Sequence, residues 1–224
     1  MNPTTKVRVK ICCIGSIEEA RLAVSYGASA IGLVSAMPSG PGPIPEDLIA
    51  AVAATVPPGI AAFLLTSRRD AAGIVAQQRR TKTNTIQIVD EFPREEYGLL
   101  RNELPGIKIV QVIHVLDENS VLEAEHASNH VDAILLDSGN PKLATKELGG
   151  TGRVHDWSIS STIRERIGVP LYLAGGLTSE NVARAIAMVR PFAVDVCSGV
   201  RTNGKLDERK LSAFFAAVNR SNAN

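Results

Sequence analysis

The sequence predicts an α/β protein, a single (β/α)8 TIM barrel that spans residues 1–224. Short runs rich in Val, Ile and Leu alternate with amphipathic segments along the chain, and there are eight such pairs. The runs mostly lack polar alternation, which is typical of strands buried on both faces. Eight strands, each followed by a helix, favour a closed barrel, and an open doubly wound sheet is the alternative.

Strands are expected where these apolar runs lie. In chain order they cover residues 7–14, 30–35, 60–66, 85–90, 108–115, 133–137, 171–174 and 193–197. Two long connections, 36–44 and 138–155, follow the second and sixth runs. In a barrel both connections lie at the carboxyl ends of the strands, where active sites are built.

Helices are expected between the strands, and several carry start and stop signals. Ser16 with Glu19 forms a capping-box pattern, and Gly27 follows as a stop. Pro45 is expected at the first position of the next helix, and Thr178 is expected to cap the seventh. The remaining helical segments are residues 70–80, 94–104, 118–128, 157–167 and 211–218.

Composition excludes several classes of function. The net charge is +1 and aromatic residues make up 4%, so no surface for nucleic acid is expected. No apolar run is long enough to cross a membrane and no signal peptide is recognisable, so we expect a cytoplasmic protein. Three cysteines make no disulfide framework and four histidines show no metal-ligand spacing, so no metal site is expected. The sequence leaves a monomer and a homodimer open.

Glycine-bearing segments after the last three predicted strands indicate a phosphate site. Glycine lets a backbone N–H approach a phosphate oxygen, and a helix N-terminus adds a favourable dipole. Barrels often bind phosphate with the loops after strands seven and eight, although glycines that only form turns are the alternative. We therefore expect a phosphorylated small-molecule substrate. Its binding residues are expected to be Gly149, Gly150, Gly152, Gly175, Gly176, Ser198 and Gly199.

Cys12 and Asp137 are the candidate acid–base pair, because they lie at or near the carboxyl ends of the first and sixth predicted strands. If both point into the barrel, the thiol and the carboxyl converge at its rim. A desolvated carboxyl can give a proton, and a thiolate can take one when a positive charge such as Lys10 is near. The alternatives are that the cysteine is a small buried hydrophobe and the aspartate a turn former.

The same alternation of strand faces bears on where four further side chains point. Asp195 is expected to face inward, as a substrate ligand or as a partner of Lys10. Cys13 is expected to point toward the helices as packing, and Cys197 is ambiguous. His114 ends the fifth strand and is expected near the pocket.

The motifs taken together resemble the phosphoribosylanthranilate isomerase family. The resemblance runs in order from about residue 7 to residue 215 and is strongest after residue 133. The motifs are Val9-Lys10-Ile11-Cys12, Leu135-Leu136-Asp137, Gly149-Gly150-Thr151-Gly152 with His155-Asp156-Trp157, Ala174-Gly175-Gly176-Leu177 with Glu180-Asn181-Val182, and Arg190-Pro191-Phe192-Ala193-Val194-Asp195-Val196 with Ser198-Gly199-Val200.

The resemblance implies an Amadori rearrangement in tryptophan biosynthesis, in which N-(5-phosphoribosyl)anthranilate becomes 1-(2-carboxyphenylamino)-1-deoxyribulose 5-phosphate. In family terms, Asp137 is the general acid that protonates the furanose ring oxygen, and Cys12 is the general base that removes the C2′ proton. Asp195 resembles the family residue near the substrate amine. The chemistry needs no cofactor, because the substrate nitrogen acts as the electron sink.

Three departures from the family pattern concern the anthranilate half of the substrate. The family usually has Cys-Gly-Ile at the first strand end, where this chain has Cys12-Cys13-Ile14. The usual Arg is missing from the Pro- and Gly-rich residues 37–43, and the usual Gln-Leu-His-Gly is replaced by Gln87-Ile88-Val89-Asp90. Two alternatives follow: a paralogous isomerase that acts on a different N-substituted phosphoribosylamine, and a non-catalytic barrel that binds a phosphosugar.

Overall fold

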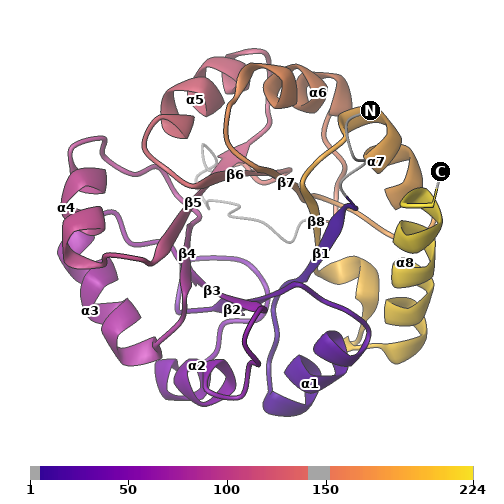
Figure 1. Cartoon of the computed structure of the whole chain (residues 1–224), viewed down its shortest axis with the longest axis horizontal. Coiled ribbons are helices and arrows are strands. Elements are labelled where there is room, and N and C mark those ends of the chain that lie inside the picture. Colours follow the sequence, from indigo (N-terminus) through magenta and orange to yellow (C-terminus); the bar gives the residue numbers. More distant parts are fainter. Residues whose placement is uncertain (1–5, 141–151, 224) are drawn as a thin grey trace.

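Eight parallel strands form a closed barrel in the computed structural model, which describes residues 6–140 and 152–223. Figure 1 shows the helices as an outer ring around these strands. The predicted barrel is confirmed, and the open sheet is excluded because β1 pairs with β8. The strands are β1 (Arg8–Ile11), β2 (Ala30–Val34), β3 (Ala61–Thr66), β4 (Thr85–Ile88), β5 (Lys108–His114), β6 (Ala133–Asp137), β7 (Leu171–Leu173) and β8 (Ala193–Val196).

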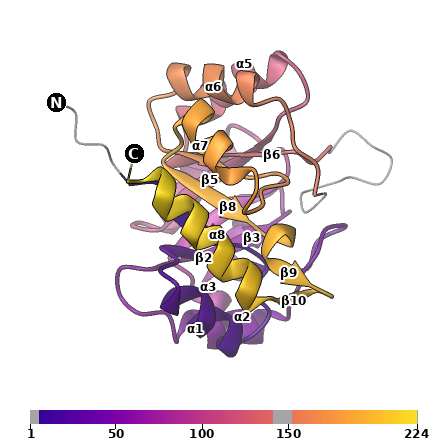
Figure 2. The same ribbon diagram turned by 90° about the vertical axis from the view of Figure 1, so that its right-hand side faces the viewer.

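Helices follow the strands in the expected order and cover the outside of the barrel. They are α1 (Ile17–Ser25), α2 (Glu46–Ala53), α3 (Ala71–Thr81), α4 (Glu96–Glu103), α5 (Asn119–Ser128), α6 (Trp157–Arg166), α7 (Val182–Val189) and α8 (Glu208–Ser221). A short 3-10 helix η1 (Ser198–Val200) and a hairpin of β9 (Arg201–Thr202) and β10 (Lys205–Leu206) separate β8 from α8. Figure 2 shows this hairpin beside the first turns of α8.

Helix caps agree with the sequence at some positions and correct it at others. The Ser16 hydroxyl accepts from the Glu19 N–H, as the capping pattern predicts. Pro45 is the N-cap of α2, one residue before the position expected for it. The expectation for Thr178 is wrong, because its hydroxyl accepts from the backbone N–H two residues on, in a turn that precedes the helix. The N-cap of α7 is Asn181.

Two layers of apolar side chains hold the barrel together. One fills the inside of the barrel and includes Phe63, Leu65, Val112 and Leu135. The larger one lies between the sheet and the helices. Because neighbouring strand residues point to opposite faces, the inner layer fixes which side chains reach the carboxyl end of the barrel. No helix in the described part of the chain is long and apolar enough to span a membrane.

Candidate active site

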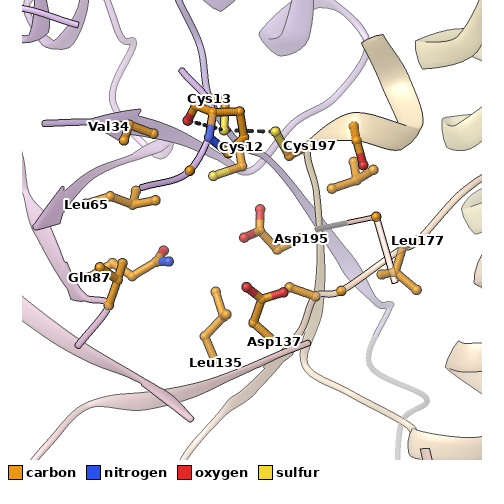
Figure 3. A pocket seen from close by; sticks show the side chains of 18 of the residues that line it. Cys12, Cys13, Val34, Leu65, Gln87, Leu135, Asp137, Leu177, Asp195 and Cys197 are labelled. Carbon is orange, nitrogen blue, oxygen red and sulfur yellow. Dashed lines mark hydrogen bonds between the residues drawn. The ribbon is translucent and has the colours of Figure 1, made fainter. Parts of the chain in front are cut away.

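A cavity at the carboxyl ends of the strands brings together the side chains expected to carry the chemistry. Cys12 follows β1, Asp137 ends β6 and Asp195 lies in β8, and all three line this cavity. Figure 3 shows the sulfur of Cys12 and the carboxyls of Asp137 and Asp195 turned toward the same space. The cavity encloses about 650 Å³ between protein atoms, part of it open to solvent.

Cys12 is buried, with 7% of its surface exposed, and a glycine on the adjacent strand makes room for it. A Cβ atom at Gly32 would lie 2.9 Å from the Cys12 Sγ and 3.1 Å from the Lys10 Nζ. Any larger residue at position 32 would therefore displace the thiol or the ammonium. The β1–β2 pairing thus presents the sulfur to the cavity with the Lys10 charge nearby.

Lys10 and Asp195 form an ion pair inside the barrel, with 2.8 Å between Nζ and Oδ2. Burial alone would lower the pKa of Lys10, but attraction by Asp195 and Cys12 outweighs it and raises this pKa. The ammonium is therefore charged at neutral pH. The second carboxylate oxygen of Asp195 is buried without a hydrogen-bond partner, which leaves it available to a bound molecule.

Asp137 lies across the barrel from β1 and is also buried, with 8% of its surface exposed. It pairs in register with His114 of β5, and its backbone carbonyl accepts from Val115. His155 lies in the loop before α6, where the negative charge of Asp137 acts to raise its pKa. Burial has the larger effect and lowers this pKa, so the ring is neutral at neutral pH. Its Nε2 bonds to the Ser160 hydroxyl.

The glycine segments pack against one another beside the acid–base candidates. Gly152, Gly175, Gly176 and Ser198 line the cavity. Gly176 has a φ of +62°, and a Cβ there would lie 2.6 Å from the Arg153 backbone. This close approach of two loops requires glycine.

Gly199 contributes through packing instead of by lining the cavity. A Cβ at Gly199 would collide with the Leu177 carbonyl oxygen, so the loop after β8 rests directly on the loop after β7. Gly149 and Gly150 lie outside the described residues.

Two expectations about neighbouring residues are wrong. Cys13 does not point toward the helices, because its φ of +61° turns it out of the strand pattern and into the lining of the cavity. Its Sγ lies 2.8 Å from the Sγ of Cys197. His114 lines a second cavity instead, where its Nε2 contacts the Val89 carbonyl oxygen at 3.0 Å.

Gln87 lines the cavity too, although it was not predicted as a site residue. It lies in β4 and is 3% exposed, with its Oε1 buried and without a hydrogen-bond partner. A buried amide between two isoleucines, at an inward-facing position of the strand, is the signal that marks it. No cluster of three or more His, Cys, Asp or Glu side chains that could hold a metal occurs among residues 6–140 and 152–223.

Comparison with known proteins identifies the family. The family described as N-(5'phosphoribosyl)anthranilate (PRA) isomerase matches residues 9–217. An N-(5'-phosphoribosyl)anthranilate isomerase of Methanosarcina acetivorans is 37% identical over 95% of this chain and 93% of its own. The chain belongs to this family. It is therefore an isomerase, and its membership argues against a non-catalytic barrel.

Solved structures of phosphoribosylanthranilate isomerases have the same fold. The Thermotoga maritima enzyme is 31% identical, with a TM-score of 0.83, and the alignment covers 96% of this chain and 99% of that one. A complex of such an isomerase with reduced 1-(o-carboxyphenylamino)-1-deoxyribulose 5-phosphate is 29% identical, with a TM-score of 0.80 and the same coverage.

Two of the departures from the isomerase family pattern, at Cys13 and in residues 37–43, meet in the wall of the cavity. Met37, Gly40 and Pro41 line it where the family usually supplies an Arg, and none of the described lining residues is basic. Arg201 does not fill this role, because its guanidinium bonds to the Glu19 carboxylate and to the carbonyl oxygens of residues 12 and 13. Asp90 lies in the second cavity.

Proposed function

We propose that this enzyme rearranges N-(5'-phosphoribosyl)anthranilate to 1-(2-carboxyphenylamino)-1-deoxyribulose 5-phosphate in tryptophan biosynthesis. The observation that carries the proposal is that Cys12 and Asp137, from different strands, line one cavity beside the glycine segments. The names of the relatives and the ligand in the related complex support the choice of substrate.

Asp137 acts as the general acid and Cys12 as the general base. The Asp137 carboxyl protonates the furanose ring oxygen, the ring C–O bond breaks, and the substrate nitrogen supplies the electron pair that makes the Schiff base. The Cys12 thiolate then removes the C2′ proton to give an enolamine, which tautomerises to the ketone. Each proton-transfer group contributes roughly 10²–10⁴-fold in rate.

Lys10 and Asp195 support this chemistry from inside the barrel, where both side chains are buried. The Lys10 ammonium stabilises negative charge on the nearby Cys12 sulfur, and Asp195 keeps that ammonium in place. The unpaired Oδ1 of Asp195 accepts a hydrogen bond from the substrate amine. Cys12 and Asp195 thus act on neighbouring substrate atoms.

The phosphate binds to the segments around Gly176 and Ser198, which line the cavity. Gly175 and Gly176 have left-handed backbones and pack so closely on neighbouring loops that Cβ atoms would not fit, and Ser198 at the start of η1 lines the same cavity. Backbone N–H groups of such glycine-rich turns commonly bind phosphate. A phosphate fixed here places the ribose between Cys12 and Asp137, since all these groups line the same cavity.

A second candidate is an isomerase with the same acid–base pair and a different amine on its phosphoribosyl substrate. The apolar lining at Met37 and Pro41, without a basic side chain among the described lining residues, favours it. A missing charged contact to a buried carboxylate would cost the anthranilate complex about 2–5 kcal/mol.

The fluorescence of phosphoribosylanthranilate distinguishes the two candidates. A catalytic amount of the enzyme should remove this fluorescence as the substrate is consumed. The Cys12→Ser variant should slow the loss of fluorescence by at least roughly a hundredfold. Rescue of a tryptophan auxotroph by the wild-type chain is the matching test in cells. No decay and no rescue would favour the second candidate.

A further inference from the structure

Cys13 and Cys197 form a thiol pair in the wall of the cavity, which the proposed reacting groups also line. Their Sγ atoms lie 2.8 Å apart, although the two residues are 184 positions apart in the chain. Figure 3 shows their sulfurs facing each other while the Cys12 sulfur points into the cavity. Cys197 is only half-buried, so a small molecule that enters the cavity can reach it.

The backbone at Cys13 is held in a conformation that ordinary side chains avoid. Its φ of +61° is left-handed, a region that strains a non-glycine residue. The loop after β2 packs on this residue, because a Cβ at Gly42 would lie 2.7 Å from the Cys13 Cβ. The Cys13 thiol also lies 3.5 Å from the Pro41 carbonyl oxygen, to which it donates. The thiol is thus fixed in direction.

The two thiols differ in their readiness to react. The contact with the Cys13 thiol and the positive charge of Arg201 lower the pKa of Cys197, against the effect of burial. The contacts with the Cys12 and Cys197 thiols raise the pKa of Cys13, and burial adds to this. A nucleophilic thiolate beside a protonated thiol is the arrangement that thiol–disulfide exchange uses.

We infer that Cys13 and Cys197 form a redox-active pair, which a low-molecular-weight disulfide converts into an intramolecular disulfide. The Cys197 thiolate attacks one sulfur of the small disulfide, whose S–S bond breaks, and one small thiolate leaves. The Cys13 sulfur then attacks Cys197 in this mixed disulfide, and the second small thiol leaves with the Cys13 proton. Two cysteine sulfurs are oxidised, and the small disulfide is reduced to two thiols.

Oxidation of this pair changes the active site at two points. Cys13 follows the proposed base Cys12, and Cys197 precedes Ser198 of the proposed phosphate site. The new bond consumes the S–H group that holds Pro41, and it draws the two sulfurs together to about 2.0 Å. The oxidised enzyme should therefore show a several-fold lower kcat/KM that dithiothreitol restores. This consequence rests on the proposed function, whereas formation of the disulfide does not.

The test is incubation of the folded enzyme with oxidised glutathione, followed by alkylation, trypsin digestion and mass spectrometry. The titratable thiols should fall from three to one, and the linked peptides should be residues 11–21 and 185–201. Cys12→Ser should still form the link, because Cys13 is then the one cysteine in the first peptide. Cys13→Gly, which suits the left-handed backbone, should not form it.

Different failures have different meanings. No link in the wild type, or a link that persists in Cys13→Gly, would overturn the inference. A link that leaves kcat/KM unchanged would overturn its effect on turnover. If the reduced enzyme does not turn over phosphoribosylanthranilate at all, the proposed function fails, and the peptide result still decides whether the pair forms a disulfide.

Discussion

Lys10 is the residue whose position the chemistry depends on most, because its buried ammonium serves both the ion pair and the proposed base. Alternation of strand faces predicted that Lys10 shares a face with Cys12, and that Asp195 faces inward as a substrate ligand or as a partner of Lys10. The 2.8 Å contact could not be predicted, since it requires the closure of β1 on β8 across the whole chain. The orientation of the Cys13 side chain could not be predicted for a different reason. Its left-handed backbone breaks the alternation of side chains between the two faces of the strand.

Replacing Lys10 by Met should destabilise the fold by about 3–5 kcal/mol, because it leaves the Asp195 carboxylate buried without its partner. Urea unfolding measures this loss. The double variant Lys10→Met/Asp195→Asn removes both charges and should recover much of the stability, while turnover stays low. A double variant no more stable than Lys10→Met would show that the pair does not account for the loss.

His155 should make the stability depend on pH. Burial lowers its pKa in the folded protein below the value of 6.5 in an unfolded chain. As the pH falls through 6.5, the unfolded chain therefore binds a proton that the folded protein does not, and the free energy of unfolding decreases. The decrease ends once the pH passes the lower folded pKa. Urea titrations of the wild type and His155→Gln on both sides of pH 6.5 measure the difference, and parallel pH profiles would contradict it.

At the level of elements, hydrophobic runs predicted which segments form strands but not where the strands end. The expected strand 7–14 ends at Ile11, and 193–197 ends at Val196. Three of the extra residues, Cys12, Cys13 and Cys197, line the cavity, and Ile14 packs in the core between sheet and helices. All four are apolar or weakly polar, so composition alone cannot separate them from the strand. The loops after β7 and β8 were predicted as partners, but their direct contact at Gly199 depends on packing.

Gly199→Ala should weaken phosphate binding, because the new Cβ pushes η1 away from the Leu177 carbonyl. We expect a KM at least several-fold higher with a smaller change in kcat. Gly168→Ala is the matched control: its φ is not left-handed either, and no atom lies within 4 Å of the place its methyl group would take. Steady-state kinetics with inhibition by inorganic phosphate measures the effect, and equal KM values for the two variants would exclude it.

For the whole molecule, the barrel closes where the beginning of the chain meets its end. The sequence predicted closure from the count of eight units, but not the contact that secures it. The Asn222 side chain accepts from the Val7 N–H at 2.8 Å and donates to the Val7 carbonyl at 3.1 Å. It thereby ties the end of α8 to the start of β1 and replaces the backbone partners that Val7 lacks in the barrel.

Asn222→Ala should lower the free energy of unfolding by about 1–2 kcal/mol, because two backbone hydrogen bonds lose their partner. Thermal and urea unfolding measure the loss. Asn219→Ala, at an exposed position on the same helix, is the control and should change stability little. If the two variants are equally stable, the Val7 contact does not contribute to closure.

The central claim is that one sulfur and one carboxyl act on the same sugar, and Asp137→Asn tests it most directly. The amide keeps the size of the side chain and removes the proton that opens the ring. We expect kcat for phosphoribosylanthranilate, followed by loss of fluorescence, to fall by roughly 10²–10⁴-fold while the reduced product analogue binds as tightly as to the wild type. A variant with wild-type kcat would contradict the assignment of Asp137 as the acid.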